Sequence, residues 1–466
     1  MLRLARSFNP NFSTMQTDII IIGAGPGGYE AAVHAAKAGR QVVLIEAAEL
    51  GGTCLNSGCI PTKCLCRNAE VLDDVREAER YGISTGGEIS FSLAKAVERK
   101  NEVVAKLVGG IEMLMKTPGI TLVKGKARFT DAHTVVAETA EGEETFTAPA
   151  IIIATGSQTK FLPIEGAHCE GVVTSTEMLN LPEVPARLCV IGGGVIGLEF
   201  ASIYHSFGSD VTVVEFCKEI LPQFDRDIAK RLRTSLKKRG ITFKTGAAVT
   251  AVRPTDGGYA VCYEEKGKEA ACEADLVLMA VGRAANLSSL NLDDIGVAHT
   301  PRGIIVDENM QTNVPGVYAI GDINGLCQLA HAATFQGFRA VNHICEKADE
   351  IRLDIVPAAV FTVPEAACVG LTEEQAAERG IAYTAHKAFY RANGKALTME
   401  ADDGLAKILC DEQGRIIGAH ILGAHAADLI HEVAVLMNAD ASLSDLSRCI
   451  HAHPALSEIL LSAAHA

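Results

Sequence analysis

The chain has 466 residues, enough for about three domains at roughly 150 residues each. Its formal net charge of -15 repels phosphate backbones, and no basic stripe with interleaved aromatic residues offsets that charge, so we expect no nucleic-acid partner. No apolar run approaches the ~18 residues that would span a bilayer, so we expect no membrane-integral segment.

The N-terminal stretch "MLRLARSFNPNFST" contains Arg3 and Arg6 and no acidic residue, a composition that a short mitochondrial presequence would also have. Met15 stands just before an apolar strand, so we favour an upstream start on a bacterial chain and expect a cytoplasmic protein, with the mitochondrial matrix as the alternative. The 14 cysteines are scattered, and no signal-peptide core precedes them. Most should be buried thiols in a reducing compartment.

Residues 18–46 read as a strand, a glycine-rich turn, a helix and a second strand. The turn carries G-x-G-x-x-G at Gly23, Gly25 and Gly28, and the second strand ends in Glu46. Such glycines let a backbone approach a pyrophosphate at the positive end of a helix, and the acid accepts a hydrogen bond from a ribose hydroxyl. The pattern predicts a dinucleotide site.

The segment "GGTCLNSGCIPTKC", residues 51–64, follows directly and places Cys54 five residues before Cys59. On an ideal helix the Cα atoms of such a pair are ~8 to 9 Å apart, whereas a disulfide needs them within ~7 Å. The two can pair only if the helix start is irregular, which residues 56–58 (Asn-Ser-Gly) tolerate.

Three interpretations of these thiols compete. With Cys64 and Cys66 they give four thiols, but the C-x4-C-x4-C-x-C spacing fits no familiar zinc or iron–sulfur site, so we expect no metal. A structural staple would gain little from so short a loop. A redox pair is favoured, because a helix N-terminus stabilises a thiolate, and Cys64 and Cys66 are then helix-packing thiols.

Residues 188–215 repeat the first pattern, with glycines at Gly192, Gly194 and Gly197 and a closing acid at Glu215. Each acid lies 23 residues after the first glycine of its turn. Two complete copies predict two bound dinucleotides.

The chemistry around each turn suggests which dinucleotide it binds. Glu215 would repel a 2′-phosphate, and only Lys218 follows instead of an arginine clamp, so the second site should prefer NAD to NADP. The first unit runs straight into the cysteine segment, where a flavin could exchange electrons with sulfur, and we therefore assign FAD to it.

The C-terminal part alternates strands in residues 404–423 with helices at 426–438 and 456–465, as an α+β dimerisation layer does. Between the helices lies "HAHPALSEIL". Histidine suits a base that works near pH 7, and His453, followed by Glu458, is the candidate, with His451 as its competitor.

These motifs together resemble the pyridine nucleotide-disulfide oxidoreductases, and among them the dihydrolipoamide dehydrogenases. The resemblance implies that Cys54 and Cys59 form the redox disulfide, that His453 and Glu458 are an acid/base dyad acting from the other subunit of a homodimer, and that Lys63 and Glu199 lie beside flavin N5. Further cofactor contacts implied in the same way are Thr155, Gly156, Asp322 and Ala330 for FAD, and Gly282, in the return crossover, for NAD.

The predicted fold class is α/β, with two Rossmann-like domains for FAD and NAD and a C-terminal α+β dimerisation domain. The predicted division is FAD domain 15–147, NAD domain 148–275, a return to the FAD domain 276–346, and interface domain 347–466.

The activity implied by the resemblance is oxidation of dihydrolipoamide by NAD+, with lipoyl domains of 2-oxoacid dehydrogenase complexes or the glycine cleavage H protein as partners. The alternatives are another NAD(P)H-dependent disulfide reductase of the family, or a flavin-binding protein without turnover. Departures from the family pattern, such as "GRAAN" without its usual proline and Gln336 where glutamate is common, weaken the assignment of substrate more than that of fold.

Overall fold

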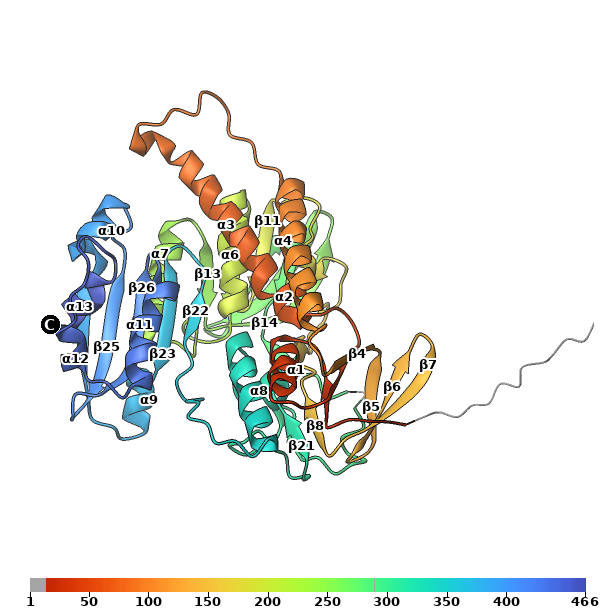
Figure 1. Ribbon diagram of the computed structural model, residues 1–466. Coiled ribbons are helices and arrows are strands. Elements are labelled where there is room, and N and C mark those ends of the chain that lie inside the picture. Colours follow the sequence, from red (N-terminus) through yellow and green to blue (C-terminus); the bar gives the residue numbers. More distant parts are fainter. Residues whose placement is uncertain (1–13, 289) are drawn as a thin grey trace, which may run out of the picture. The chain divides into compact units, whose positions relative to one another are not determined.

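The computed structural model describes residues 14–288 and 290–466 (Figure 1). The interpretation of the N-terminal stretch as a presequence therefore lies outside the described residues. The chain forms two compact units, each assembled from separate segments. The first contains residues 14–56, 105–158 and 284–351, and the second contains residues 57–104, 159–283 and 352–466.

The first unit is built on a five-stranded parallel sheet in the order β21-β8-β2-β3-β4. Its strands are β2 (Ile19–Ile22), β3 (Val42–Glu46), β4 (Ile120–Lys124), β8 (Ala150–Ile153) and β21 (Val317–Ala319). Every residue of β2 is buried, as expected for a strand covered on both faces. A second sheet has the order β1-β7-β6-β5, with β1 (Met15–Gln16), β5 (Lys126–Asp131), β6 (Thr134–Thr139) and β7 (Gly142–Thr147).

Helix α1 (Pro26–Lys37) packs against α8 (Ala330–Ile344) at two glycines (Figure 1). A Cβ on Gly27 would lie 3.0 Å from the carbonyl oxygen of Ala333, and one on Gly337 would lie 3.0 Å from that of Gly27. Side chains at these positions would push the helices apart. The other short elements of this unit are β19 (His299–Thr300), β20 (Gly303–Ile304) and the 3-10 helix η2 (Gly321–Asn324).

The second unit contains another five-stranded parallel sheet, in the order β10-β17-β11-β12-β13. Its strands are β10 (Val172–Val173), β11 (Arg187–Ile191), β12 (Asp210–Glu215), β13 (Thr242–Thr245) and β17 (Leu276–Met279). An antiparallel three-stranded sheet is inserted between β13 and β17: β14 (Ala247–Thr255), β15 (Gly258–Glu265) and β16 (Lys268–Ala274). The associated helices are α5 (Ser175–Met178), α6 (Val195–Phe207) and α7 (Arg226–Lys238).

The C-terminal part of the second unit is an antiparallel sheet in the order β22-β23-β26-β25-β24. Its strands are β22 (Ala358–Val360), β23 (Glu365–Gly370), β24 (Tyr383–Phe389), β25 (Leu405–Asp411) and β26 (Ile416–Gly423). Its helices are α9 (Glu373–Glu378), η3 (Tyr390–Ala392), α10 (Gly394–Thr398), α11 (Ala426–Asn438), α12 (Leu443–Ser447) and α13 (Glu458–Ala464).

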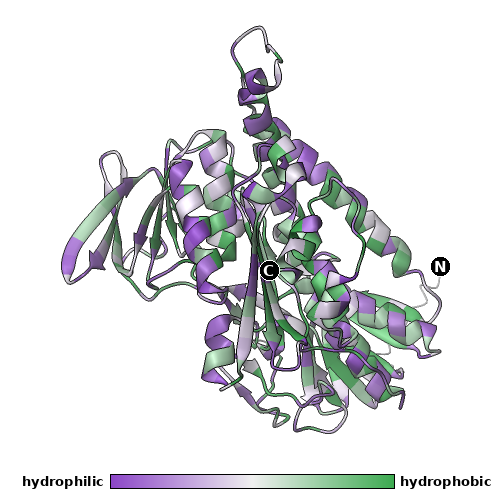
Figure 2. Cartoon of the chain, turned by 90° about the vertical axis from the view of Figure 1, so that its left-hand side faces the viewer, coloured by the Kyte–Doolittle hydropathy of each residue, from purple (hydrophilic) through white to green (hydrophobic). Residues whose placement is uncertain are grey.

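The remaining elements belong to the connections between these layers. They are α2 (Gly52–Ser57), α3 (Cys59–Arg76), η1 (Ala78–Tyr81), α4 (Leu93–Leu114), β9 (Ser157–Thr159) and β18 (Arg283–Ala285). One apolar cluster in the second unit joins α3, α6, β11 and strands of the antiparallel sheet. Helices that cover such a core carry green apolar and purple polar residues on the same element, as Figure 2 shows.

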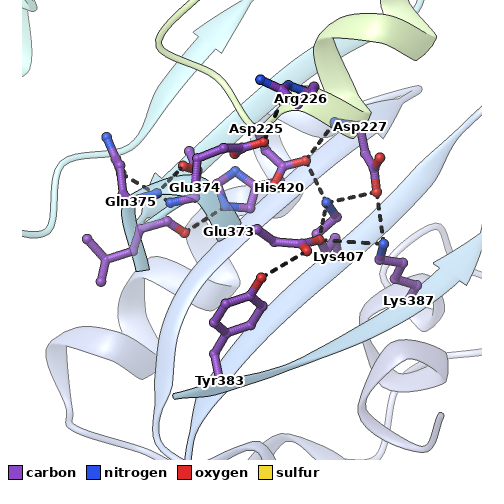
Figure 3. Close-up of polar contacts among 12 residues, drawn as sticks. Asp225, Arg226, Asp227, Glu373, Glu374, Gln375, Tyr383, Lys387, Lys407 and His420 are labelled. Carbon is purple, nitrogen blue, oxygen red and sulfur yellow. Dashed lines mark hydrogen bonds and ion pairs between the residues drawn. The ribbon is translucent and has the colours of Figure 1, made fainter. Parts of the chain in front are cut away.

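A buried charge cluster joins the start of α7 to the C-terminal five-stranded antiparallel sheet (Figure 3). The Nζ atom of Lys407, in β25, lies 2.6 Å from Asp225, 3.0 Å from Asp227 and 2.6 Å from Glu373. The side chains of Lys407 and Asp225 are each only 1% exposed. Lys387 adds a second cation, 2.8 Å from Asp227. We call these five residues the Lys407 cluster.

The predicted fold class is confirmed, since two parallel sheets with glycine-rich turns are joined to a C-terminal α+β layer. One detail differs: α1 and α6 begin at Pro26 and Val195, inside the glycine motifs and not after them. Pro26 has the fixed φ that favours the first helical position. Within the described residues no helix is long and apolar enough to cross a membrane. The four-segment domain division stays a prediction.

Candidate active site

The first glycine turn has room for a ligand at one position and no room at the other two. Gly23 has φ +103°, and a Cβ there would lie 2.4 Å from the carbonyl oxygen of Ala154. A Cβ on Gly28 would clash with the Gly23 carbonyl. Gly25, which caps α1, faces open space, and no side chain caps the helix. The free amides of α1 thus point to a place where a phosphate fits.

Glu46 closes this turn. One carboxylate oxygen accepts a hydrogen bond from the Ala24 amide at 2.6 Å, and the other accepts one from the Ala48 amide at 2.7 Å. These bonds hold the carboxylate at the mouth of the turn. Because a carboxylate oxygen accepts more than one hydrogen bond, Glu46 can still receive a ribose hydroxyl.

The segment that carries Asp322 is a short turn held from beneath by Gln336. The buried Gln336 side-chain oxygen accepts hydrogen bonds from the Gly321 amide at 2.7 Å and from the Asn324 side chain at 2.9 Å. Asp322 in turn accepts a hydrogen bond from the Ser157 hydroxyl at 2.5 Å. A neutral amide here supplies the acceptor without burying a charge. Sequence reasoning noted Gln336 only as a departure and missed this positioning role.

The crossover after β8 is bound to the returning chain. The Thr155 hydroxyl donates to the Asn286 carbonyl at 3.3 Å, and the Asn286 amide donates to the Gly156 carbonyl at 3.0 Å. Ala330 is the first residue of α8, and that helix also has no side-chain cap. Thr155, Gly156, Asp322 and Ala330 all belong to the first unit, with the first glycine turn.

The second glycine turn repeats the geometry of the first in the second unit. Gly192 has φ +111°, and a Cβ there would lie 2.4 Å from the Ala280 carbonyl oxygen. A Cβ on Gly197 would lie 2.1 Å from the Gly192 carbonyl oxygen. Gly194 caps α6 without a side-chain bond and faces open space. The close contacts of the second turn thus correspond to those of the first, as the repeated sequence motif suggested.

Glu215 is held as Glu46 is. Its oxygens accept hydrogen bonds from the Gly193 amide at 2.5 Å and the Cys217 amide at 2.6 Å. Lys218 is exposed, and Gly282, with φ +105°, accepts a hydrogen bond from the Lys160 amide on its carbonyl. A buried carboxylate fixed at this point repels a 2′-phosphate and suits the unmodified ribose of NAD.

The cysteine segment is an interrupted helix. Helix α2 ends at Ser57, Gly58 takes φ -139° and ψ -113°, and α3 begins at Cys59. Cys54 therefore stands in one short helix and Cys59 at the start of the next, which is the irregularity that pairing requires. Cys59 is exposed and Cys54 partly buried. Cys64 and Cys66 are buried on α3, where the Cys66 thiol donates to the Phe361 carbonyl.

Lys63 and Glu199 form an ion pair in the second unit. The Lys63 Nζ lies 2.9 Å from each carboxylate oxygen of Glu199, which is 4% exposed and also accepts the Phe361 amide at 3.0 Å. Burial favours neutral Lys63, but the charge and hydrogen bond of Glu199 outweigh it and the pKa of Lys63 is raised. A lysine held charged in this way can stabilise negative charge nearby.

His453 and Glu458 also lie together. The His453 Nδ1 is 3.1 Å from one oxygen of Glu458, whose other oxygen accepts the Ala455 amide at 2.9 Å. These hydrogen bonds, the Ala455 amide foremost, lower the pKa of Glu458. The His453 side chain is 77% exposed, so its Nε2 is accessible to a reacting group.

His451 has a different environment. Its side chain is 7% exposed, its Nε2 lies 2.8 Å from Glu432, and its Nδ1 lies 3.0 Å from the Cys449 carbonyl oxygen. Both ring nitrogens thus already face protein acceptors. This geometry favours His453 over its sequence neighbour as the base.

Two open, uncapped helix ends with their acids fit two dinucleotides, and a thiol pair at an interrupted helix fits disulfide exchange. These features, each within its own segment of the chain, are those of the flavin-dependent disulfide oxidoreductases. Residues 17–337 match the model of the pyridine nucleotide-disulphide oxidoreductases, and residues 356–464 match the dimerisation domain of that family. The chain belongs to this family, and its cofactors are FAD and NAD.

Relatives align over nearly the whole chain. The dihydrolipoyl dehydrogenase of Geobacillus stearothermophilus is 40% identical over 97% of this chain and 96% of its own length. The mitochondrial dihydrolipoyl dehydrogenase of Pisum sativum is 41% identical over 97% of this chain and 91% of its own. Among solved structures, the HOCl-induced flavoprotein disulfide reductase RclA of Escherichia coli, in its Cu(II) complex, superimposes with a TM-score of 0.84 at 32% identity, covering 97% of this chain and 99% of that one. The matched dimerisation domain indicates a homodimer.

Proposed function

We propose that the protein is a dihydrolipoamide dehydrogenase, which oxidises dihydrolipoamide to lipoamide with NAD+. The observation that carries this proposal is the end-to-end similarity, at about 40% identity, to enzymes named for that reaction. The interrupted helix with Cys54 and Cys59 supplies the thiols that the chemistry needs.

The proposed thiol chemistry uses both cysteines in a disulfide. A thiolate of dihydrolipoamide attacks the sulfur of Cys54, and the bond to Cys59 breaks, leaving Cys59 as a thiolate. The second substrate thiol then attacks the mixed disulfide, lipoamide is released, and Cys54 leaves as a thiol. The substrate has lost two electrons and the cysteine pair has gained them. Cys59 is more exposed than Cys54, so exposure does not single out Cys54 as the sulfur that is attacked. That assignment rests on the family resemblance.

The proposed base is His453, contributed by the other subunit of the homodimer. It takes the proton of the substrate thiol, and Glu458 orients the imidazole and stabilises its charged form, as the 3.1 Å contact allows. The fixed carboxylate accepts the Ala455 amide as well, so the dyad is held by the backbone of its own loop.

The cofactor groups are assigned to the residues already described. The first glycine turn with Glu46 would hold the FAD pyrophosphate and ribose, with Thr155, Gly156, Asp322 and Ala330 toward the flavin. The second turn with Glu215 and Gly282 would hold NAD. When bound, FAD would supply the redox chemistry that links the cysteine pair to hydride transfer with NAD+. Lys63, held charged by Glu199, would offset negative charge on the flavin ring.

The proposed partners are lipoyl domains of 2-oxoacid dehydrogenase complexes or the glycine cleavage H protein, and the proposed compartment is the cytoplasm. The partners follow from the proposed substrate, because a lipoyl group bound to its carrier must be reoxidised where its acyl-transfer complex works.

The test is steady-state turnover of the purified holoenzyme with dihydrolipoamide and NAD+, with NADP+ in parallel. We expect rapid turnover that is specific for NAD+, abolished by Cys54→Ser and retained by the control Cys169→Ser, which changes a partly buried cysteine outside the motif. His453→Gln should lower kcat by ~10²-fold or more, whereas His451→Gln should retain most of the turnover. Turnover unaffected by Cys54→Ser would overturn the proposal.

A second candidate is an NAD(P)H-dependent reductase of another disulfide in the same family. The superposition with the RclA structures at 32–33% identity favours this candidate, because the name of that protein is disulfide reductase and does not mention a lipoyl group. Negligible turnover of dihydrolipoamide together with rapid NADH oxidation by a different disulfide would decide for this candidate.

A further inference from the structure

A second pair of cysteines lies in contact within the NAD-binding part of the chain. The sulfur atoms of Cys189 and Cys272 are 3.6 Å apart, although the residues are separated by 83 positions. Cys189 is fully buried in the middle of β11, and Cys272 is partly buried in β16. Neither belongs to the glycine turns or to the redox segment.

The backbones on either side of this pair are fastened to each other. Arg187, two residues before Cys189, donates to Asp275 through its guanidinium at 2.6 Å and forms an ion pair with Glu273 at 2.5 Å. Its backbone closes the clamp, because the Arg187 amide donates to the Asp275 carboxylate and the Asp275 amide donates to the Arg187 carbonyl. The segments that carry the two sulfurs are therefore held together by one arginine, which bonds both Asp275 and Glu273, and by main-chain bonds.

The surroundings of the two thiols shift their pKa values in opposite directions. The hydrogen bond between the two sulfurs lowers the pKa of Cys272 against the opposing effect of its burial, and Lys244 lowers that pKa further. The same hydrogen bond and full burial raise the pKa of Cys189. The lowered pKa favours Cys272 as the nucleophile of the pair, and Cys272 is also the partly exposed one of the two, on the edge strand β16 of the three-stranded sheet.

We propose that Cys189 and Cys272 form a second, reversible disulfide when the protein meets a hydroperoxide. The Cys272 thiolate attacks the peroxide, the O–O bond breaks, water or an alcohol leaves, and Cys272 becomes a sulfenic acid. The Cys189 sulfur then attacks the Cys272 sulfur, the S–O bond breaks, and water leaves with the Cys189 proton. Two thiols lose two electrons and two protons, and the hydroperoxide gains them.

The new bond requires the sulfurs to close from 3.6 Å to ~2.05 Å. It would tie β16, and through it the antiparallel three-stranded sheet, to the central strand β11, which leads into the Gly192 turn. A crosslink over so long a loop restricts the unfolded chain strongly. The disulfide therefore protects the NAD-binding layer and spares Cys272 from irreversible oxidation, whichever disulfide the enzyme acts on.

The test treats the reduced holoenzyme with hydrogen peroxide, blocks remaining thiols, and maps peptides by mass spectrometry without reduction. We expect a peptide linking Cys189 and Cys272 that has lost two hydrogens, that disappears with dithiothreitol, and that accompanies a rise in melting temperature. Both changes should be absent in Cys272→Ser. They should persist in Cys262→Ser, a control in the neighbouring strand β15 that faces Ala271.

Oxidation of Cys272 to sulfinic acid without the linked peptide would overturn the proposal. So would a pair that stays reduced at peroxide levels which oxidise Cys54 and Cys59. Because wild-type protein supplies both readouts, the result does not depend on whether the variants fold.

Discussion

Replacing Lys407 with methionine is expected to be among the most destabilising single changes in the C-terminal half. Methionine keeps the length and most of the volume of lysine, so packing in β25 is preserved while the positive charge is lost. Asp225, which is 1% exposed and whose second oxygen has no hydrogen-bond partner among the described residues, would then be buried without a cation.

The magnitude follows from that burial. Removing one partner of a buried ion pair costs about 3–5 kcal/mol, because the remaining charge stays desolvated. Among the described residues the Asp225 side chain then keeps the Asp227 amide at 3.0 Å as its hydrogen-bond donor, and Lys387 can still neutralise Asp227. We therefore expect Lys407→Met to lower the free energy of unfolding by about 3–5 kcal/mol. Changing the exposed Lys230 on α7 to methionine should lower it by less than about 0.5 kcal/mol.

The measurement is urea unfolding followed by circular dichroism, at fixed protein and FAD concentrations because ligand and dimer both add apparent stability. The double variant Lys407→Met, Asp225→Leu should recover part of the loss, since it removes the stranded charge. If the free energy of unfolding of Lys407→Met differs from that of wild type by less than about 1 kcal/mol, and so resembles that of Lys230→Met, then the charge cluster is not desolvated and the reasoning fails.

Three further predictions concern single contacts. Gln336→Leu removes the acceptor of the Gly321 amide and one of the two oxygen acceptors of the Asn324 side chain, which keeps the Ala319 carbonyl, so FAD should be lost on gel filtration, while Gln336→Glu should retain it. Glu215→Gln removes a charge-assisted acceptor worth about 1.5–3 kcal/mol, so the KM for NAD+ should rise by ~10-fold or more with little change in kcat. Hydrogen bonds led by Lys387 lower the pKa of Asp227 from 3.8 to about 2; its stabilising contribution is present above the unfolded pKa and is lost as pH falls from about 4 to 2, so Asp227→Asn should flatten the acid-unfolding curve in that window.

Each of these has a result that would contradict it. FAD bound equally well by Gln336→Leu would show that the turn holds without its acceptor. An unchanged KM for NAD+ in Glu215→Gln would remove the carboxylate from ribose recognition. An acid-unfolding curve of Asp227→Asn that overlays wild type would mean that the paired carboxylate is equally stable in the unfolded chain.

Local patterns in the sequence were sufficient for the elements that bind dinucleotides. The helix Ala426–Asn438 has in the structure the bounds that the sequence predicted, and the strand Asp210–Glu215 closes the second dinucleotide unit at the acid where the repeat placed it. The two glycine turns could be located because part of the steric requirement of each lies within a few residues, as the close contacts of Gly28 with the Gly23 carbonyl and of Gly197 with the Gly192 carbonyl show. The start of α1 was displaced by three residues because Pro26 already takes a helical φ inside the motif.

The sequence by itself thus predicted the fold class and located the two glycine turns and the cysteine segment, because each leaves a residue pattern within a short stretch of the chain. Only the tertiary structure showed the hydrogen bonds of Gln336, the different environments of His453 and His451, the Lys407 cluster and the approach of Cys189 to Cys272. Each of these depends on which side chains folding brings together. A buried charge or thiol takes its chemistry from the partner that folding supplies, and no periodicity along the chain records that partner.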